Sequence, residues 1–321
     1  PDSRPDPSDP YAIAGLYADR FLQDAKMLGL KVALEAEGDP TLMPRPTKMI
    51  PEMLAMIARL IERGCAYVAG PAGARAVYFS VQAFPDYGQL SGNTLERLRS
   101  GAGGRISDEH QSQKKHPADF LLWKEDPRHL MKWDSPWGAG YPGWHIECSA
   151  MAAKRLADTA GTIDLHSGGE DNIFPHHECE IAQSRCASGS ATYARHWFHP
   201  RFLLVEGDKM SKSKGNFFTA RDLFAKGYEP AALRLELIKT HYRSNANFTL
   251  QGLADSQRMV ERWRRVLGPP DVSAGGPCFE HEPRKDFWKV TPVEKEVTSA
   301  LEDDLNVAGA IGVINGWVSL L

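Results

Sequence analysis

The chain has 321 residues, 42% of them hydrophobic, which predicts two or three domains with buried cores. With 38 basic and 41 acidic residues the net charge is −3, which excludes a global field that recruits nucleic acid or membrane. The five cysteines lack the spacing of a secreted framework, and no apolar run approaches the roughly 18 residues of a membrane helix, which predicts a cytoplasmic setting. The proline at position 1, without a leader after it, indicates a trimmed chain or fragment.

The first third of the chain predicts two helices and a hairpin. Apolar residues at helical spacing predict an amphipathic helix over about 11–29 and a second helix over 48–63 that ends at Gly64. "CAYV" and "AVYFSV", separated by a glycine-rich turn, predict a β-hairpin. Residues 83–117 are polar and rich in glycine, which favours a surface insertion.

The middle of the chain alternates short apolar runs with helical patterns, as buried strands of an α/β sheet would. Pro175 is expected in the first turn of its helix. The predicted elements are strands over 118–123, 162–167 and 201–207, and helices over 149–160 and 172–187.

Helices dominate the remainder of the chain. Thr219 and Asp222 have the spacing of a capping box, and residues 268–277 have the composition of a linker. The predicted helices are 219–226, 230–240, 250–267 and 292–321.

Three residues have the chemistry of a metal site. His176 and Glu180 lie four residues apart and share a helix face, although such a pair is usually a solvated surface contact. Cys148 lies at a predicted loop-to-helix junction, where amide donors would favour a thiolate. Sulfur, nitrogen and oxygen donors together suit zinc and leave one position for a substrate. His177 faces about 100° away and is a weaker candidate, and Cys179 points toward core or surface.

A second candidate feature is a glycine turn that precedes the predicted helix over 172–187. Gly168 and Gly169 would let a ligand approach the backbone, and Asp171 could accept a hydrogen bond from a ribose hydroxyl. A tight turn without function is the alternative. The remaining cysteines, Cys65, Cys186 and Cys278, have no partners at ligand spacing.

The third candidate feature is the segment "DKMSKSKGN" at 208–216, which carries Lys209, Lys212 and Lys214. A predicted strand precedes it, a Gly215–Asn216 turn follows it, and serines stand where acidic partners would have neutralised the charge. Such a loop can close over a triphosphate, where one cation contributes about 10² to 10³ in rate. A solvated charge run is the alternative.

The motifs "GWHIECSAM", "LHSGGEDNIFPHHECEIAQS", "KMSKSKGNFFT" and "HYRSNANF" together resemble cysteinyl-tRNA synthetases, the class I enzymes that join cysteine to its tRNA. The resemblance runs from about residue 11 to the C-terminus. "KMSKS" marks any class I synthetase, whereas the combination of Cys148, His176 and Glu180 is much narrower.

The resemblance implies a role for each matching residue. It implies zinc on Cys148, His176 and Glu180, bound cysteine near Trp144 and His166, catalytic roles for Lys209 and Lys212, and ATP contacts by Lys212, Met210, Ser211, Gly169 and Asp171. The implied partners are tRNA(Cys), L-cysteine and ATP with Mg²⁺. The resemblance also implies a monomer that does not associate with a membrane.

The implied fold is an α/β, Rossmann-type class I catalytic domain with a connective insertion, followed by a helical bundle. The family's "HIGH" signature and a first zinc cysteine would lie upstream, so the chain is expected to be an internal piece that is inactive alone. The implied parts are a helical remainder of the first catalytic half (1–45), the insertion (46–117), the second catalytic half with the zinc site (118–206), the KMSKS loop and stem-contact region (207–248) and an incomplete bundle (249–321).

The implied function is ATP-dependent activation of cysteine to cysteinyl-adenylate and its transfer to tRNA(Cys). One alternative is the related ligase that couples cysteine to a glucosaminyl inositol in mycothiol synthesis. That relative lacks the carboxylate matching Glu180. Another alternative is a catalytically silent tRNA-binding paralogue that contains zinc.

Overall fold

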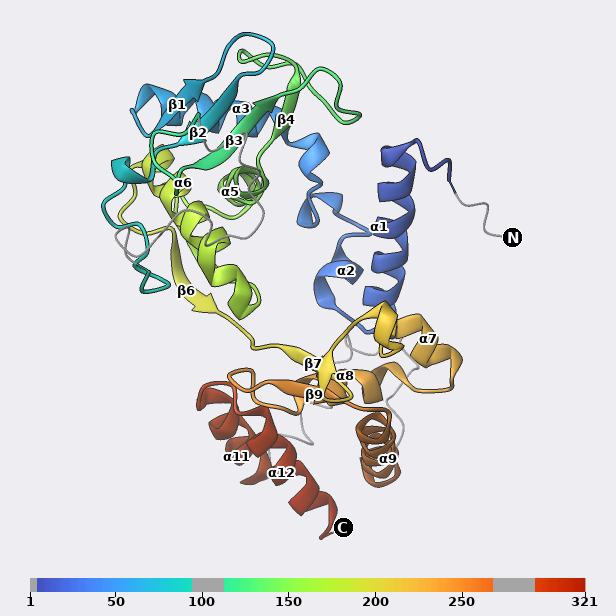
Figure 1. Cartoon of the computed structure of the whole chain (residues 1–321). Helices are drawn as coiled ribbons and strands as arrows, with labels where there is room; N and C mark the ends of the chain where they lie inside the picture. The colour runs from blue at the N-terminus through green and yellow to red at the C-terminus, as the bar shows by residue number, and fades with distance from the viewer. Residues whose placement is uncertain (1–4, 94–112, 268–291, 321) are drawn as a thin grey trace. The chain divides into compact units, whose positions relative to one another are not determined.

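The computed structural model describes residues 5–93, 113–267 and 292–320, and the chain forms two compact units (Figure 1). The sheet unit comprises Asp39–His199 with Pro7–Pro10, and the helical unit comprises Tyr11–Gly38 and Pro200–Leu321 with Pro1–Asp6. No helix in the described ranges has both the length and the apolar character that spanning a membrane requires. The predicted linker 268–277 and Cys278 lie outside the described residues.

The sheet unit is built on a four-stranded antiparallel sheet in the order β1-β2-β3-β4. Its strands are β1 (Ala66–Ala69), β2 (Ala76–Phe79), β3 (Phe120–Glu125) and β4 (Gly140–Pro142). The predicted hairpin is confirmed as β1 and β2, with Ala66 opposite Phe79. Strands β2 and β3 pair across the expected boundary at residue 117, and the domain boundaries stay a prediction.

Three helices pack on one another and form the core together with strands β2 and β3, and α3 and α5 also contact the sheet. They are α3 (Ile50–Glu62), α5 (Trp144–Arg155) and α6 (Glu178–Ser188). Helix α3 buries Met53, Ile57 and Leu60, which recur at the spacing of one helix face. The start of α5 approaches β3 so closely at Gly143 that a Cβ there would lie 2.0 Å from the carbonyl oxygen of Leu121. Only a glycine fits at this position.

Two parallel strands pair with each other, one before α6 in the chain and one after it. The strands are β5 (Ile163–Ser167) and β6 (Ala194–Phe198). The prediction of a buried strand over 162–167 is wrong in its burial, since Leu165 is 58% exposed. Strand β5 pairs only with β6 within the described residues, so one flank has no neighbouring strand.

The prediction of one helix over 172–187 is wrong at its start. Phe174 has extended dihedrals (φ −134°, ψ 132°), and the regular helix α6 begins only at Glu178. The cause is Pro175, because a proline disfavours helical dihedrals in the residue before it. His176 and His177 therefore lie in an irregular turn that leads into α6.

The helical unit contains a small sheet in the order β8-β7-β9, with β7 and β9 parallel. Its strands are β7 (Leu203–Val205), β8 (Asp208–Lys209) and β9 (Ala246–Phe248). Its helices are α1 (Pro10–Met27), α2 (Lys31–Glu35), α7 (Ala220–Ala225), α8 (Pro230–Ile238), α9 (Leu250–Leu267), α11 (Pro292–Glu302) and α12 (Val307–Val318).

Five short 3₁₀ turns occur in the described part of the two units, at Pro40–Leu42, Pro46–Lys48, Val81–Ala83, Glu170–Asn172 and Lys212–Lys214.

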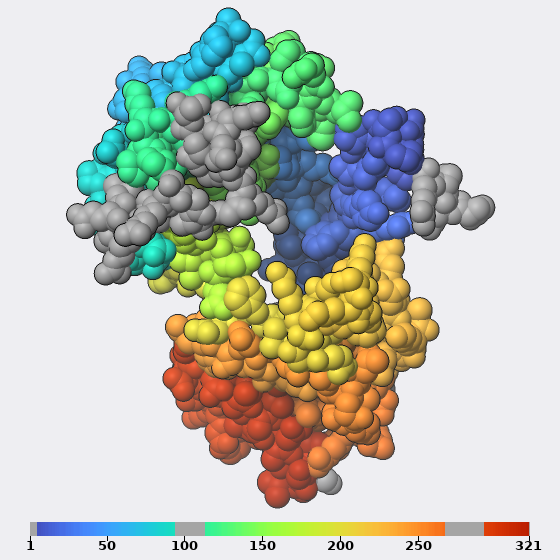
Figure 2. All heavy atoms as spheres, viewed as in Figure 1, coloured from blue at the N-terminus to red at the C-terminus, as the bar shows by residue number. Residues whose placement is uncertain are grey.

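Two local predictions for the helical unit have different outcomes. The capping box at the start of α7 is confirmed, with Thr219 and Asp222 each accepting from the other's backbone amide. The prediction of one helix over 292–321 is wrong, because Asp304 and Leu305 have positive φ and separate α11 from α12. The two helices pack against each other, and their atoms form one continuous red body in Figure 2.

Candidate functional site

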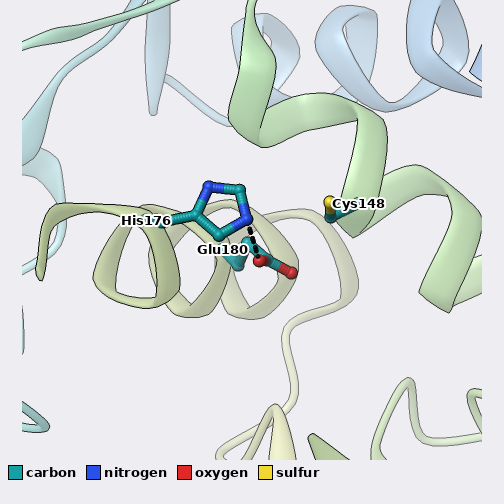
Figure 3. Close-up of side chains that lie close together, drawn as sticks. All are labelled: Cys148, His176 and Glu180. Carbon is teal, nitrogen blue, oxygen red and sulfur yellow. Dashed lines mark ion pairs between the residues drawn. The ribbon is translucent and has the colours of Figure 1, made fainter. Parts of the chain in front are cut away.

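Cys148, His176 and Glu180 converge in the sheet unit. Cys148 comes from α5, His176 from the turn before α6 and Glu180 from the first turn of α6 (Figure 3). One potential ligand atom from each lies within 4.8 Å of the others. His176 and Glu180 are buried and Cys148 is half-buried. The predicted zinc residues are thus close enough for a single ion to contact all three.

Glu180 is the best-connected member of this cluster. Its Oε2 accepts a hydrogen bond of 2.9 Å from the Tyr193 hydroxyl and lies 3.4 Å from His166 Nε2. Its Oε1 lies 2.9 Å from His176 Nε2. Burial raises the pKa of Glu180, but the contacts with His166 and His176 outweigh it and lower the pKa to about 2. The residue is therefore a carboxylate at neutral pH.

A buried oxygen of Glu180 supports the fit of these residues to a zinc ion, independently of their spacing in the sequence. Although Glu180 Oε1 lies near His176, the alignment is not that of a hydrogen bond, and this buried oxygen has no hydrogen-bond donor among the residues described. A buried carboxylate oxygen to which no group donates a hydrogen bond is costly. A cation held by sulfur, nitrogen and oxygen would satisfy it.

The prediction that backbone amides at a loop-to-helix junction favour the Cys148 thiolate is wrong. Cys148 is the fifth residue of α5, beyond the amide donors of the first turn. Burial, with the carboxylates of Glu180 and Glu147 nearby, raises the pKa of the thiol to about 12. Backbone donors therefore do not favour the thiolate here, and a bound cation would have to do so.

The neighbouring histidines form a second group around Glu180. His166, His177 and Glu180 also place one potential ligand atom each within 4.8 Å of one another, so His177 faces the cluster more closely than expected. His177 Nδ1 lies 2.8 Å from His199 Nε2. Burial and the nearby His166 lower the pKa of His177 to about 4.

The described cysteines other than Cys148 pack in or against the core. Cys179 is 1% exposed, and its sulfur lies 3.3 Å from the Tyr87 hydroxyl. Its placement in the core matches the expectation that it points away from the His176 face. Cys65 and Cys186 lie in or against the same hydrophobic core.

Trp144, a predicted substrate contact, borders the cluster, and the glycine turn follows β5. The Trp144 ring is 62% exposed and stacks on His176, with 4.4 Å between ring centroids. Gly168 lies so close to His177 that a Cβ there would come within 2.8 Å of its ring. Gly169 precedes a short 3₁₀ turn in which Asp171 is exposed, so that Asp171 can meet a ligand from solvent.

The lysine loop lies in the helical unit. Lys212 is exposed and its Nζ lies 5.2 Å from the centroid of the Phe217 ring. Lys209 is the last residue of β8, and Met210 follows it. The expectation that no acidic group neutralises the loop is wrong for Lys214, which pairs with Asp208 at 3.1 Å.

Asn216, which the sequence marked only as part of a turn, anchors this loop. Its Oδ1 accepts from Ser211 N at 2.9 Å, and its Nδ2 donates to the carbonyl oxygens of Val205 at 3.0 Å and Lys209 at 3.3 Å. The residue is 9% exposed, and its bond to Val205 is buried, whereas the other two are partly buried. One side chain thus ties both ends of the loop to β7.

We expect Asn216→Ala to lower the free energy of unfolding by about 1–3 kcal/mol, because it leaves buried backbone groups unpaired. Hydrogen exchange at Ser211 should become faster, which mass spectrometry would measure on the variant and the parent. Asn216→Asp keeps the acceptor and loses the donor, so exchange at Ser211 should change less. Unchanged exchange in Asn216→Ala would contradict the anchoring role.

Comparisons with known proteins agree with the motifs. The family model described as tRNA synthetases class I (C) catalytic domain matches residues 12–258. A cysteine–tRNA ligase of Chlorobaculum tepidum is 41% identical over 315 residues, and one of Thermus thermophilus is 44% identical over 280 residues. These alignments cover 98% and 86% of this chain but 59% and 54% of the two relatives, so the chain spans little more than half their length.

Solved structures confirm the expected fold class. The methionyl-tRNA synthetase of Mycobacterium tuberculosis in complex with methionyl-adenylate aligns with a TM-score of 0.61 at 13% identity, over 96% of this chain and 71% of that one. Such low identity shows the fold alone, which is that of a class I synthetase. With the family model matching most of its length, the chain belongs to the class I (C) tRNA synthetase catalytic-domain family.

Proposed function

We propose that the protein to which this chain belongs is an ATP-dependent cysteine–tRNA ligase. It would form cysteinyl-adenylate and pyrophosphate from cysteine and ATP and then transfer the cysteinyl group to tRNA(Cys). The observation that carries the proposal is the convergence of Cys148, His176 and Glu180, in a chain whose curated relatives are named cysteine–tRNA ligase. A monomeric state and a cytoplasmic setting are parts of the same proposal.

Selection of cysteine would take place at these three side chains. When bound there, zinc would hold the substrate thiol as a thiolate, a contact that a serine hydroxyl makes far less well. Trp144, stacked on His176 and open to solvent, offers a flat surface beside the site for the amino acid. His166, between Glu180 and the Trp197 ring, would limit how deep the substrate reaches. Losing one strong contact discriminates far better than pocket shape does.

Activation of cysteine would depend on positioning and charge. The cysteine carboxylate attacks the α-phosphate of ATP, so no side chain has to act as the nucleophile. We assign Lys209 and Lys212 to the phosphates, with Met210 and Ser211 as further ATP contacts. Gly169 and Asp171 are assigned to the adenosine side, and Mg²⁺ accompanies ATP. The exposure of Lys212 and Asp171 supports their availability to ATP.

A direct comparison of acceptors tests the proposal. The intact protein, with its zinc content measured, is given cysteine and ATP together with either tRNA(Cys) or a glucosaminyl inositol. Charging of the tRNA is expected, preceded by cysteine-dependent ATP–pyrophosphate exchange. Ligation to the sugar amine alone would favour the mycothiol-type ligase. Zinc and tRNA binding without exchange would favour a catalytically silent paralogue.

A further inference from the structure

His145 makes a contact with the metal cluster that none of the assigned roles uses. It lies on α5 three residues before Cys148, and its Nδ1 is 2.7 Å from Nδ1 of His176. The other ring nitrogen of His176, Nε2, faces Glu180 Oε1 at 2.9 Å. The two nitrogens of His176 thus face different groups, a carboxylate oxygen at Nε2 and an imidazole nitrogen, within hydrogen-bond distance, at Nδ1.

The distance between the two Nδ1 atoms places one proton between them. Two imidazole nitrogens at 2.7 Å make a hydrogen bond only when one carries hydrogen and the other presents a lone pair. If His176 gives the lone pair of Nε2 to an ion, its own proton must be on Nδ1. His145 Nδ1 is then the acceptor, and the proton of His145 is on Nε2.

The surroundings of His145 keep its ring in the orientation that this bond needs. The Phe120 ring meets it edge-on, with centroids 5.7 Å apart and an interplanar angle of 88°. The Trp144 ring stacks on it at 5.5 Å. Aromatic packing on two sides restricts rotation of the imidazole. The acceptor atom is therefore preorganised toward His176.

We propose that His145 is a positioning residue for the metal, because its Nδ1 accepts the Nδ1–H of His176 and thereby keeps Nε2 of His176 free to bind the ion. This inference rests on the proposed zinc site and adds a residue to it. Outer partners of this kind orient a histidine ligand, and their loss typically costs about 10- to 100-fold in metal affinity.

Zinc affinity of the intact protein, measured by competition with a chromophoric chelator, tests the inference without an activity assay. His145→Phe keeps a flat ring between Phe120 and Trp144 but lacks the acceptor, so zinc should bind about 10- to 100-fold more weakly. His145→Asn places an amide oxygen near the former Nδ1 position and should restore most of the affinity. His196→Phe, an exposed histidine on β6, is the matched control and should bind zinc as the parent does.

Each outcome has a distinct meaning. Equal affinity in His145→Phe and the parent overturns the positioning role while leaving the zinc site in place. Weak binding in both His145→Phe and His145→Asn, with lowered melting temperatures, also overturns it, because the ring would then act only by packing. A parent protein that binds no zinc overturns the site itself and this inference with it.

Discussion

Cys148→Ser should abolish zinc binding and lower cysteine-dependent ATP–pyrophosphate exchange of the intact protein by more than about 10²-fold. The substitution removes the only sulfur donor of the cluster, and a hydroxyl replaces a thiolate very poorly on zinc. Loss of a metal ligand should lower zinc affinity more than loss of a residue that only orients a ligand, which already lowers it by about 10- to 100-fold. Metal analysis of the purified variant and the exchange assay measure the two effects.

A matched control for this prediction is Cys186→Ser. Cys186 lies on α6, the helix that carries Glu180, but it packs against the hydrophobic core outside the cluster. The same change from sulfur to oxygen should leave zinc content and exchange near those of the parent. Stoichiometric zinc in Cys148→Ser would show that this cysteine is not a ligand.

Lys212→Ala should slow adenylate formation by about 10² to 10³ while zinc stays bound. The size follows from removing one well-placed cation from a phosphoryl transition state. Zinc should stay because Lys212 lies in the helical unit and the cluster lies in the sheet unit. Single-turnover measurement of pyrophosphate release, together with metal analysis, gives both quantities.

Lys214→Ala is the matched control for the lysine loop. Its ammonium group pairs with Asp208 at 3.1 Å, so its charge is already partly neutralised, whereas Lys212 packs over the Phe217 ring. We therefore expect a much smaller effect on the rate from Lys214→Ala. Equal effects of the two substitutions, or zinc loss in Lys212→Ala, would show that the role of the loop has been misassigned.

Local sequence rules predicted those elements that local forces determine. The hairpin β1–β2 follows from a turn between two apolar runs, and α3 follows from apolar residues at helical spacing. The break at Phe174 could have been predicted, because the next residue is a proline. The break at Asp304 could not, because the sequence around it continues a helical pattern and the positive φ has no glycine to mark it.

Only those contacts of the candidate site that join residues close in the sequence could be predicted from their spacing. His176 and Glu180 meet because they are four residues apart and the turn that carries His176 leads directly into α6. The contacts of Tyr193 with Glu180 and of His145 with His176 join residues 13 and 31 positions apart, which no periodicity relates. For His145 the motif "GWHIEC" was a signal, since the histidine stands beside the proposed Trp144 contact. Its partner became evident only in three dimensions.

The hydroxyl of Tyr193 makes the two oxygens of Glu180 unequal. Because this hydroxyl donates to Oε2 and no donor reaches Oε1, a cation that binds through Oε1 alone leaves the bond to Tyr193 undisturbed. Larger alkaline-earth ions collect six to eight oxygens and commonly take both from one carboxylate. A phenol on one oxygen thus favours an ion that needs a single oxygen from this carboxylate over one that takes both.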